Sequence, residues 1–232
     1  MYLSDSYLFT IDANIIDIGS DEKGQYLVLD KTIFYPQGGG QKADKGKISN
    51  DFADIEVNDV RQLDDEIRHY CSPFNNGTFT LNSKVKCVLN EELRLLNMKY
   101  HTAGHLLGNV VDEMPINIKS RKCHAFPGES YVEFMGAELP NRDLLVDKLK
   151  HAILAQLPIK SFEIGRQQFE ELYYKLPYDV PLNKNFRVVQ IGNYSPIPCG
   201  GTHLSSTTEI GEIEIRKIKS KDDVVKISYG LK

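Results

Sequence analysis

Short runs of β-forming residues fill the first third of the chain and alternate with turn residues. Apolar residues alternate with polar ones, or cluster, in six segments: Tyr7–Ile18, Gln25–Asp30, Gly46–Ser49, Ile55–Val60, Glu66–Cys71 and Lys84–Leu89. When apolar residues recur at every second position, one face of the strand is apolar and points toward a core. Short strands separated by Gly, Asn and Asp are typical of a small barrel or a sandwich. The pattern therefore predicts an all-β first domain.

The periodicity becomes helical at Asn90. Asn90 is a good N-cap, and Glu91 and Glu92 suit the positive end of a helix. Pro115 ends the pattern, because proline cannot continue a helix. The apolar positions between them form one helical stripe: Leu93, Leu96, Ala103, Leu107 and Val110. We therefore predict a long helix between Asn90 and Pro115.

The rest of the chain mixes helices with hairpin-like strands. A second helix, stopped by Pro158, is predicted by the apolar positions Leu144, Leu145, Leu149, Ile153 and Leu157, and a shorter third helix by Arg166–Tyr174. Strands are predicted at Tyr131–Phe134, Phe186–Ile191, Glu212–Ile218 and Val224–Tyr229. The mixture predicts an α+β fold, in which a two-layer α/β sandwich follows the β domain. We place the boundary after residue 88, which gives domains 1–88 and 89–232.

Composition narrows the class of protein. A hydrophobic content of 41% over 232 residues is typical of a globular chain. The amino terminus contains Asp5 and lacks both a basic segment and a long apolar run, so we expect neither a signal peptide nor a membrane span. Without secretion signals, the four cysteines are expected to be reduced thiols of a cytoplasmic protein.

Charge leaves room for a nucleic-acid partner. The net charge of −4 excludes a chain coated in basic residues, but it does not exclude a local basic patch. Two clusters are candidates: Lys119, Arg121 and Lys122, and then Arg216, Lys217, Lys219 and Lys221. For either cluster taken alone, a solvated face is the better interpretation.

Two pairs of residues carry the strongest chemical signal. His101 and His105 lie in "HTAGH", and Cys199 and His203 lie in "CGGTH". On a helix, the two histidines at i and i+4 point the same way and can chelate one ion. Either pair alone could be coincidence, but together three imidazoles and one thiolate are a ligand set that suits zinc. The sequence therefore predicts a Zn²⁺ site formed by His101, His105, Cys199 and His203.

The role of that zinc is ambiguous from the residues alone. Four protein ligands usually close a structural site, while a catalytic site keeps one position for water. The ligands come from distant segments, however, and Gly200 and Gly201 follow Cys199, as expected where a substrate approaches. We expect a catalytic site in which one ligand is weak or displaced.

A second unusual segment runs from Asp30 to Gly46 and contains "YPQGGGQ". Three adjacent glycines after a proline do not suit a helix or a central strand. The segment lacks the spacing of a Walker loop or a Rossmann fingerprint, so we expect no nucleotide cofactor. Its polar members Thr32, Gln37 and Gln41 are candidates for contact with a small polar substrate.

The motifs occur together in one known family. The segments "LDKTIFYPQGGGQKADKG", "MKYHTAGHLL", "FPGESYVEF", "RVVQIGNYSPIPCGGTHLSSTTEIGEIEI" and "KISYG" stand in the order found in the editing domain of alanyl-tRNA synthetase. The resemblance covers almost the whole chain. A free-standing chain of this size, with an N-terminal β-barrel, resembles the AlaX trans-editing proteins of medium length.

The resemblance implies an activity and a set of site residues. It implies hydrolysis of the ester that joins a wrong amino acid, chiefly serine and also glycine, to tRNA(Ala). His101, His105, Cys199 and His203 would be the zinc ligands. Thr32 and Gln41 would serve catalysis and substrate binding, together with Gly38, Gly39 and Gly40. The chain departs from the family at Gln37, where Glu is common, and at Lys226, where Arg is usual.

The substrate chemistry is consistent with this activity. An apolar pocket rejects an added hydroxyl by only about 10²-fold, whereas a site that hydrogen-bonds the hydroxyl discriminates by roughly 10⁴ or more. Thr32 is the candidate that reads the hydroxyl of serine. Two alternatives stay open: editing of another mischarged tRNA such as Ser-tRNA(Thr), and a non-catalytic, zinc-stabilised tRNA-binding module. We expect a monomer without a membrane partner.

Overall fold

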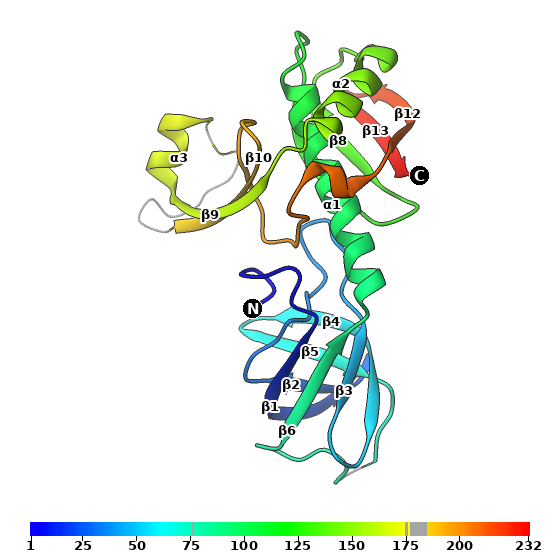
Figure 1. The fold of residues 1–232 in the computed structure, drawn as a ribbon, viewed down its shortest axis with the longest axis vertical. Coiled ribbons are helices and arrows are strands. Elements are labelled where there is room, and N and C mark those ends of the chain that lie inside the picture. Colours follow the sequence, from blue (N-terminus) through cyan, green and yellow to red (C-terminus); the bar gives the residue numbers. More distant parts are fainter. Residues whose placement is uncertain (76, 175, 177–184) are drawn as a thin grey trace. The chain divides into compact units, whose positions relative to one another are not determined.

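The six β-segments of the first third of the sequence form six strands that close into a barrel (Figure 1). Their bounds are β1 (Thr10–Asp21), β2 (Gly24–Leu29), β3 (Gly46–Ser49), β4 (Asp54–Leu63), β5 (Glu66–Cys71) and β6 (Lys84–Leu89). The order around the barrel is β1-β2-β5-β4-β3-β6, and all neighbours are antiparallel. The choice between barrel and sandwich is thus resolved in favour of the barrel.

The structure is a computed structural model that describes residues 1–75, 77–174, 176 and 185–232. The chain divides into two compact units, Met1–Met98 and Lys99–Lys232. The division falls within α1 (Glu91–Asp112), while the last barrel strand ends at Leu89, beside the boundary expected from sequence. None of the described helices is long and apolar enough to cross a membrane.

The barrel is filled by the inward positions of its strands and of the segment that follows β2. The fully buried members include Ile15, Leu27, Ile33, Phe34 and Ile48. Burying side chains of this size removes apolar surface from water, at roughly 25 cal/mol per Å². Because Ile33 and Phe34 are buried in this core, the first residues of the glycine-rich segment are held in place.

The first turns of α1 bear out the predicted cap but not the predicted stripe. The Asn90 side chain accepts a hydrogen bond from the Leu93 amide at 3.0 Å, so it is the N-cap. Leu96 is 39% exposed, although its apolar character predicts burial. The buried face carries Arg94, Asn97 and Met98 instead. Further along the helix the predicted stripe is confirmed, since Ala103, Leu107 and Val110 are buried. The departure is confined to the first turns, where Arg94 is buried in an ion pair with Asp44.

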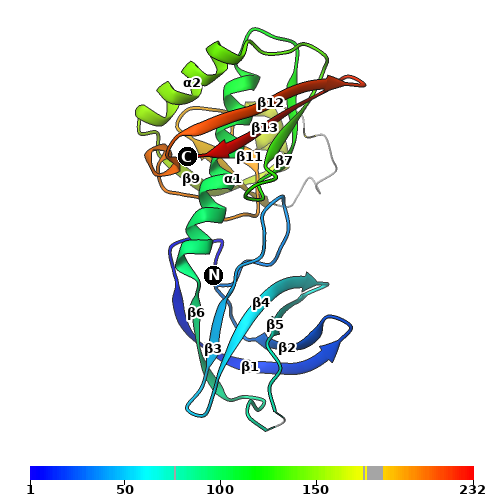
Figure 2. The ribbon, with the colours of Figure 1, turned by 90° about the vertical axis from the view of Figure 1, so that its right-hand side faces the viewer.

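The second unit combines helices with two antiparallel sheets (Figures 1 and 2). The four-stranded sheet has the order β12-β13-β8-β7, with bounds β7 (Lys119–His124), β8 (Tyr131–Met135), β12 (Ile213–Lys221) and β13 (Val224–Leu231). The three-stranded sheet has the order β11-β10-β9, with bounds β9 (Ile159–Gly165), β10 (Asn185–Ile191) and β11 (Ile197–Pro198). The helices are α1, α2 (Arg142–Leu154), α3 (Arg166–Leu172) and the 3-10 turn η1 (Thr207–Ile210). The α+β class is confirmed.

Several element ends differ from the predictions. The second helix stops at Leu154 rather than Leu157, because Gln156 adopts a positive φ of 52° that no helix continues through. The third helix stops at Leu172, two residues early. Strands β7, β9 and β11 were not predicted. For β7 the reason is its composition, since four of its six residues are exposed and polar.

The helix α1 packs on the four-stranded sheet through Gly104, the glycine of "HTAGH". A Cβ at this position would collide with the Cys123 sulfur and lie 2.7 Å from the Tyr229 hydroxyl oxygen. The Tyr229 hydroxyl in turn donates to the Tyr100 carbonyl on α1 at 2.8 Å. Helix and sheet therefore fit together only with glycine here, and this packing fixes the rotation of the neighbouring histidines.

Candidate metal centre

The first half of the centre is the His101–His105 pair on α1. Both side chains are buried, with 1% and 5% of their surface exposed, and their ring centroids lie 4.9 Å apart. This is the spacing of neighbours one helical turn apart. The pair therefore points into the interior of the second unit, as a shared ion would require.

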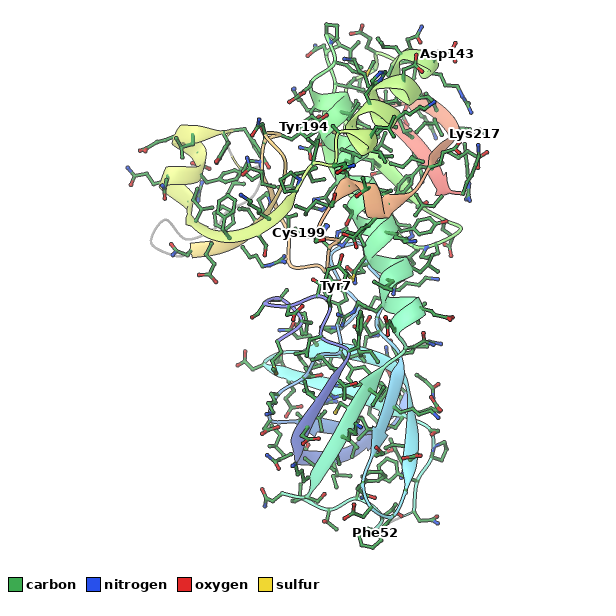
Figure 3. The ribbon with its side chains drawn as sticks, viewed as in Figure 1. Tyr7, Phe52, Asp143, Tyr194, Cys199 and Lys217 are labelled. Atoms are coloured by element: carbon green, nitrogen blue, oxygen red, sulfur yellow. The ribbon has the colours of Figure 1, made fainter. Side chains whose placement is uncertain are left out.

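The second half comes from the loop between β11 and η1, where Figure 3 labels Cys199. The Cys199 amide donates to the Arg187 carbonyl of β10 at 3.1 Å. The Arg187 guanidinium donates back to the carbonyls of Cys199 and Gly201, at 2.7 and 3.1 Å. Gly201 then donates its amide to the Cys199 sulfur at 3.2 Å. Arg187 thus ties down the loop that presents Cys199 and His203.

The two halves meet in one cluster. The four candidate ligand atoms, one from each residue, all lie within 4.8 Å of one another. The Cys199 sulfur lies 3.3 Å from His203 Nε2 and 3.6 Å from His101 Nε2. A tetrahedral zinc with ordinary bond lengths separates sulfur and nitrogen ligands by about 3.5 Å. The spacing and the donor set therefore fit a zinc ion.

The protonation states of the cluster follow from burial. Burial, together with the neighbouring His105 and Arg187 charges, holds the pKa of His101 well below its usual value, and burial lowers the pKa of His105 to about 4. Burial also raises the pKa of Cys199 to about 11, against the opposing effects of the Gly201 amide and the Arg187 charge. The imidazoles are thus neutral at pH 7, which is the form that binds metal, and the thiol must release a proton on binding.

Hydrogen bonds from residues that are not themselves ligands orient the ligand side chains. Thr102 Oγ1 lies 3.1 Å from Nδ1 of His203, and it accepts the Leu204 amide at 3.2 Å. His203 thereby keeps Nε2 for the cluster. Nδ1 of His105 is buried without a hydrogen-bond partner among the described residues. An unpaired buried nitrogen is costly, and coordination of a metal ion would satisfy it.

The predicted barrel residues lie in the first unit. Thr32 is buried, and its hydroxyl lies 2.8 Å from Nε2 of the fully buried His69. Nδ1 of His69 donates to the Leu27 carbonyl at 2.9 Å, since a carbonyl can only accept, so Nε2 accepts and the Thr32 hydroxyl donates. The Phe34 amide donates to Thr32 Oγ1 at 3.0 Å. The hydroxyl hydrogen of Thr32 is therefore committed to His69.

The three glycines form a tight turn. Gly38 and Gln41 exchange backbone hydrogen bonds of 3.2 and 2.8 Å, and between them Gly39 and Gly40 have φ values of +52° and +82°. Two consecutive positive φ values are those of a type I′ turn, which favours glycine at both positions. The Gln41 side chain is fully buried. Backbone geometry accounts for Gly39 and Gly40 without any ligand.

Sequence reasoning missed three residues that support these segments. Arg187 and Thr102 hold the metal cluster, and Asp44 anchors the end of the glycine-rich segment. Thr102 could have been suspected, because it directly follows a predicted ligand. Arg187 lies in an ordinary strand pattern and carries no local signal. Its importance depends on contacts with a loop that is reached only after β11.

Comparison with known proteins places the chain in a family. The model of the family "tRNA synthetases class II (A)" matches residues 8–93. The model of the family "Threonyl and Alanyl tRNA synthetase second additional domain" matches residues 186–226. The second match contains Arg187, Cys199 and His203. Residues 8–93 and residues 186–226 are thus each similar to a known part of a synthetase.

Relatives that are similar over nearly the whole chain point to the same family. The chain is 33% identical over 226 residues to the alanyl-tRNA editing protein AlaX-L of Pyrococcus horikoshii, covering 95% of this chain but 54% of that protein. It is 32% identical over 237 residues to AlaX-M of Methanosarcina acetivorans, covering 95% of this chain and 93% of that protein. It is 29% identical to the alanine–tRNA ligase of Ignicoccus hospitalis, of which it spans 25%. The chain therefore belongs to the family of alanyl-tRNA editing proteins.

Proposed function

We propose that this chain is a zinc-dependent aminoacyl-tRNA deacylase that removes serine, and also glycine, from tRNA(Ala). It would act in trans, on tRNA that a synthetase has already charged. Support for this mode comes from AlaX-M relatives, which the chain covers over 93% of their length. It would need no nucleotide cofactor, because ester hydrolysis is downhill in water.

One observation carries the proposal: His101, His105, Cys199 and His203 converge although they come from distant segments. A structural zinc knuckle draws its ligands from short, neighbouring spacings. Here the ion would join a helix to a glycine-containing loop. Of the four ligands only Cys199 is half-buried, while the histidines are buried. In the proposed reaction, the substrate would approach the cluster from the Cys199 side.

The residues of the chain divide the task. His101, His105, Cys199 and His203 would hold the zinc, which when bound supplies a Lewis acid for polar groups of the substrate. Arg187 and Thr102 keep the ligands in place. Thr32 would recognise the serine hydroxyl. Because its own hydrogen is donated to His69, Thr32 can only accept from that hydroxyl.

The test is a deacylation assay with metal analysis on the same sample. Ser-tRNA(Ala) and Gly-tRNA(Ala) should be hydrolysed and Ala-tRNA(Ala) spared, by a protein that contains about one zinc per chain. Cys199→Ala should lose metal and most of the activity. Cys71→Ala, which changes a half-buried cysteine of the barrel, is the matched control and should keep both.

Two results would redirect the assignment. Faster cleavage of Ser-tRNA(Thr) than of Ser-tRNA(Ala) would identify a different mischarged tRNA as the substrate. Tight RNA binding with a full complement of zinc, but without ester cleavage, would identify a non-catalytic binding module. Full activity of Cys199→Ala with unchanged zinc content would reject the metal assignment.

A further inference from the structure

The two basic clusters of the sequence share one face of the four-stranded sheet. β12 and β7 are its opposite edges, about 14 Å apart at the usual strand spacing. On β13, Val225, Ile227 and Tyr229 are buried, so the alternating positions point outward. Through the strand register, the outward positions include Lys119, Lys122, Lys217, Lys219, Lys221 and Lys226, which we call the basic face.

The lysines of the basic face form rows across the strands. Lys219 of β12 pairs with Lys226 of β13, which pairs with Glu133 of β8, which pairs with Lys122 of β7. All except the half-buried Lys226 are exposed. The Lys226 ammonium lies 3.3 Å from the centroid of the Tyr131 ring, which holds it in place. Lys217, labelled in Figure 3, continues the β12 series.

Two β-bulges add arginines to the same face. The register shifts between Ile215 and Lys217 on β12, and between Ser120 and Lys122 on β7. A bulge inserts one extra residue and re-aims its side chain. Arg121, in the β7 bulge, reaches the sulfur of the outward Met135 at 3.6 Å. Arg216, in the β12 bulge, lies over Gly230, whose missing side chain leaves room for it.

The charges on this face are not balanced locally. Glu133 and Glu214 are the outward carboxylates of the four strands, and the exposed Asp222 and Asp223 add two at the β12–β13 turn, against eight lysines and arginines. A side-chain contact with Lys219, and the repulsion between the two charges, lower the pKa of Lys217 below its usual value. Crowding like charges is unfavourable, and it occurs here in a chain of net charge −4. The basic face therefore has the electrostatics of a surface that binds a polyanion.

We propose that the basic face binds the phosphate backbone of the tRNA substrate, along the double-stranded acceptor arm. The inference rests on the proposed function for the identity of the RNA. Lysine contacts phosphate as a point charge and reads no base, so the contacts position the RNA and do not specify its sequence. The solvated-face interpretation, adequate for each cluster alone, does not explain why both clusters and both bulges share one face.

The experiment measures binding separately from catalysis. Uncharged tRNA(Ala) is titrated with the zinc-loaded full-length protein, by fluorescence anisotropy over a series of salt concentrations. In K217E/K219E/K221E the affinity should fall by about tenfold or more, and the slope of log K against log salt should flatten by roughly 0.9 for each lost phosphate contact. K217Q/K219Q/K221Q, which removes charge without adding acid, should show a smaller loss in the same direction.

The matched control is K148E/K150E/K160E, which makes the same charge change at exposed lysines of α2 and β9 in the same unit. Equal losses in the control and the test variant, or an unchanged salt slope in the test variant, would overturn the proposal. Circular dichroism of each variant verifies folding.

Deacylation kinetics separate this inference from the proposed function. With Ser-tRNA(Ala), the β12 variant should raise KM and leave kcat nearly unchanged. With serylated adenosine, which has no acceptor arm, the variant and the parent should be equally active. If no ester is cleaved by any form, the proposed function fails, while the tRNA titration still decides the basic face. If esters are cleaved but tRNA binding does not change, only the inference about the basic face fails.

Discussion

At the residue scale, the directions of the hydrogen bonds that a side chain already makes decide whether it can still donate or accept another one. Thr32 was singled out from sequence as a hydroxyl that contacts substrate. The structure shows that this hydroxyl already donates to His69 and accepts from the Phe34 amide. One lone pair remains. The proposed recognition of serine by Thr32 is therefore limited to accepting a hydrogen bond.

Replacing Thr32 by valine should relax discrimination. Without the acceptor, the ratio of kcat/KM for Ser-tRNA(Ala) to that for Ala-tRNA(Ala) should fall by about tenfold or more, as expected when a recognised hydroxyl loses its partner. Thr32→Ser keeps the hydroxyl and is the matched control. An unchanged ratio in Thr32→Val would remove Thr32 from the recognition site. The assay must be run well below the unfolding temperature, because the mutation also leaves a buried His69 nitrogen unpaired, at about 1–3 kcal/mol.

His69 should make stability depend on pH. Burial lowers its pKa from 6.5 to about 4, so the unfolded chain takes up a proton at a higher pH than the folded chain does. The stabilising effect is complete above pH 6.5 and is lost as pH falls from about 6.5 to 4. Between pH 7 and pH 5 the loss attributable to His69 should be about 2 kcal/mol.

The measurement is urea unfolding followed by circular dichroism at both pH values. His69→Gln removes the titrating group, so its stability should change less between pH 7 and pH 5 than that of the parent. An identical pH dependence in both proteins would contradict the assignment. The comparison between proteins cancels the contribution of the other buried histidines.

At the element scale, one buried ion pair connects the glycine-rich segment to α1 within the first unit. Arg94 is fully buried, and its Nε donates to both carboxylate oxygens of Asp44 at 3.0 Å. Asp44 also accepts the Tyr35 amide at 2.6 Å. Another Arg94 nitrogen reaches the carbonyl of Ser6 at 2.8 Å. The turn between Tyr35 and Asp44 is thus clamped at its end.

Asp44→Asn should destabilise the barrel strongly. The mutation leaves the Arg94 charge buried without its partner, which costs about 3–5 kcal/mol. Asp59→Asn is the matched control, because it breaks the pair with Arg61 at a site that is about 30% exposed, where ion pairs contribute under about 1 kcal/mol. Urea unfolding of the two variants gives the comparison. Equal losses would show that the Arg94 charge is not confined as the structure indicates.

At the scale of the whole molecule, the metal cluster links segments that no local interaction would bring together. Its helix and its loop belong to the second unit, whereas the barrel has a hydrophobic core of its own. An ion that binds only the folded state stabilises it by about 4 kcal/mol when its free concentration is a thousand times Kd. Loss of the ion should therefore destabilise the second unit more than the first.

Removing the metal should loosen the second unit selectively. After chelation, amide hydrogen exchange should accelerate in α1 from Lys99 onward and in the segment 197–210. Barrel strands β1 to β6 should keep their protection, and re-addition of Zn²⁺ should restore the rest. Cys199→Ala without chelator should reproduce the pattern. Uniform acceleration across both units, or none in the second unit, would contradict a metal bound at this cluster.

An element of the fold can be predicted from sequence when the residues that determine it are close neighbours along the chain. All six barrel strands are predicted by alternation and turn residues: β3, β5 and β6 have the predicted bounds, whereas ends of β1 and β4 differ by three residues. The exposed, basic β7 was missed, since an edge strand without an apolar face has no such pattern. Leu96 was misplaced for the opposite reason. Its apolarity predicts burial, but in the first turns of α1 the buried face carries Arg94, whose partner Asp44 lies elsewhere in the chain.

The sequence by itself determined which residues can bind a metal, because ligand chemistry resides in the side chains and the i, i+4 spacing on a helix fixes two of them together. It also determined the β-strands of the first domain and the cap of α1, which depend on near neighbours, but the closure of the strands into a barrel was decided by the structure. Only the tertiary structure decided that Cys199 and His203 meet His101 and His105, that Arg187 and Thr102 support them, and that two basic clusters share a face. These depend on contacts between distant segments, and such contacts follow from packing and strand register rather than from local sequence.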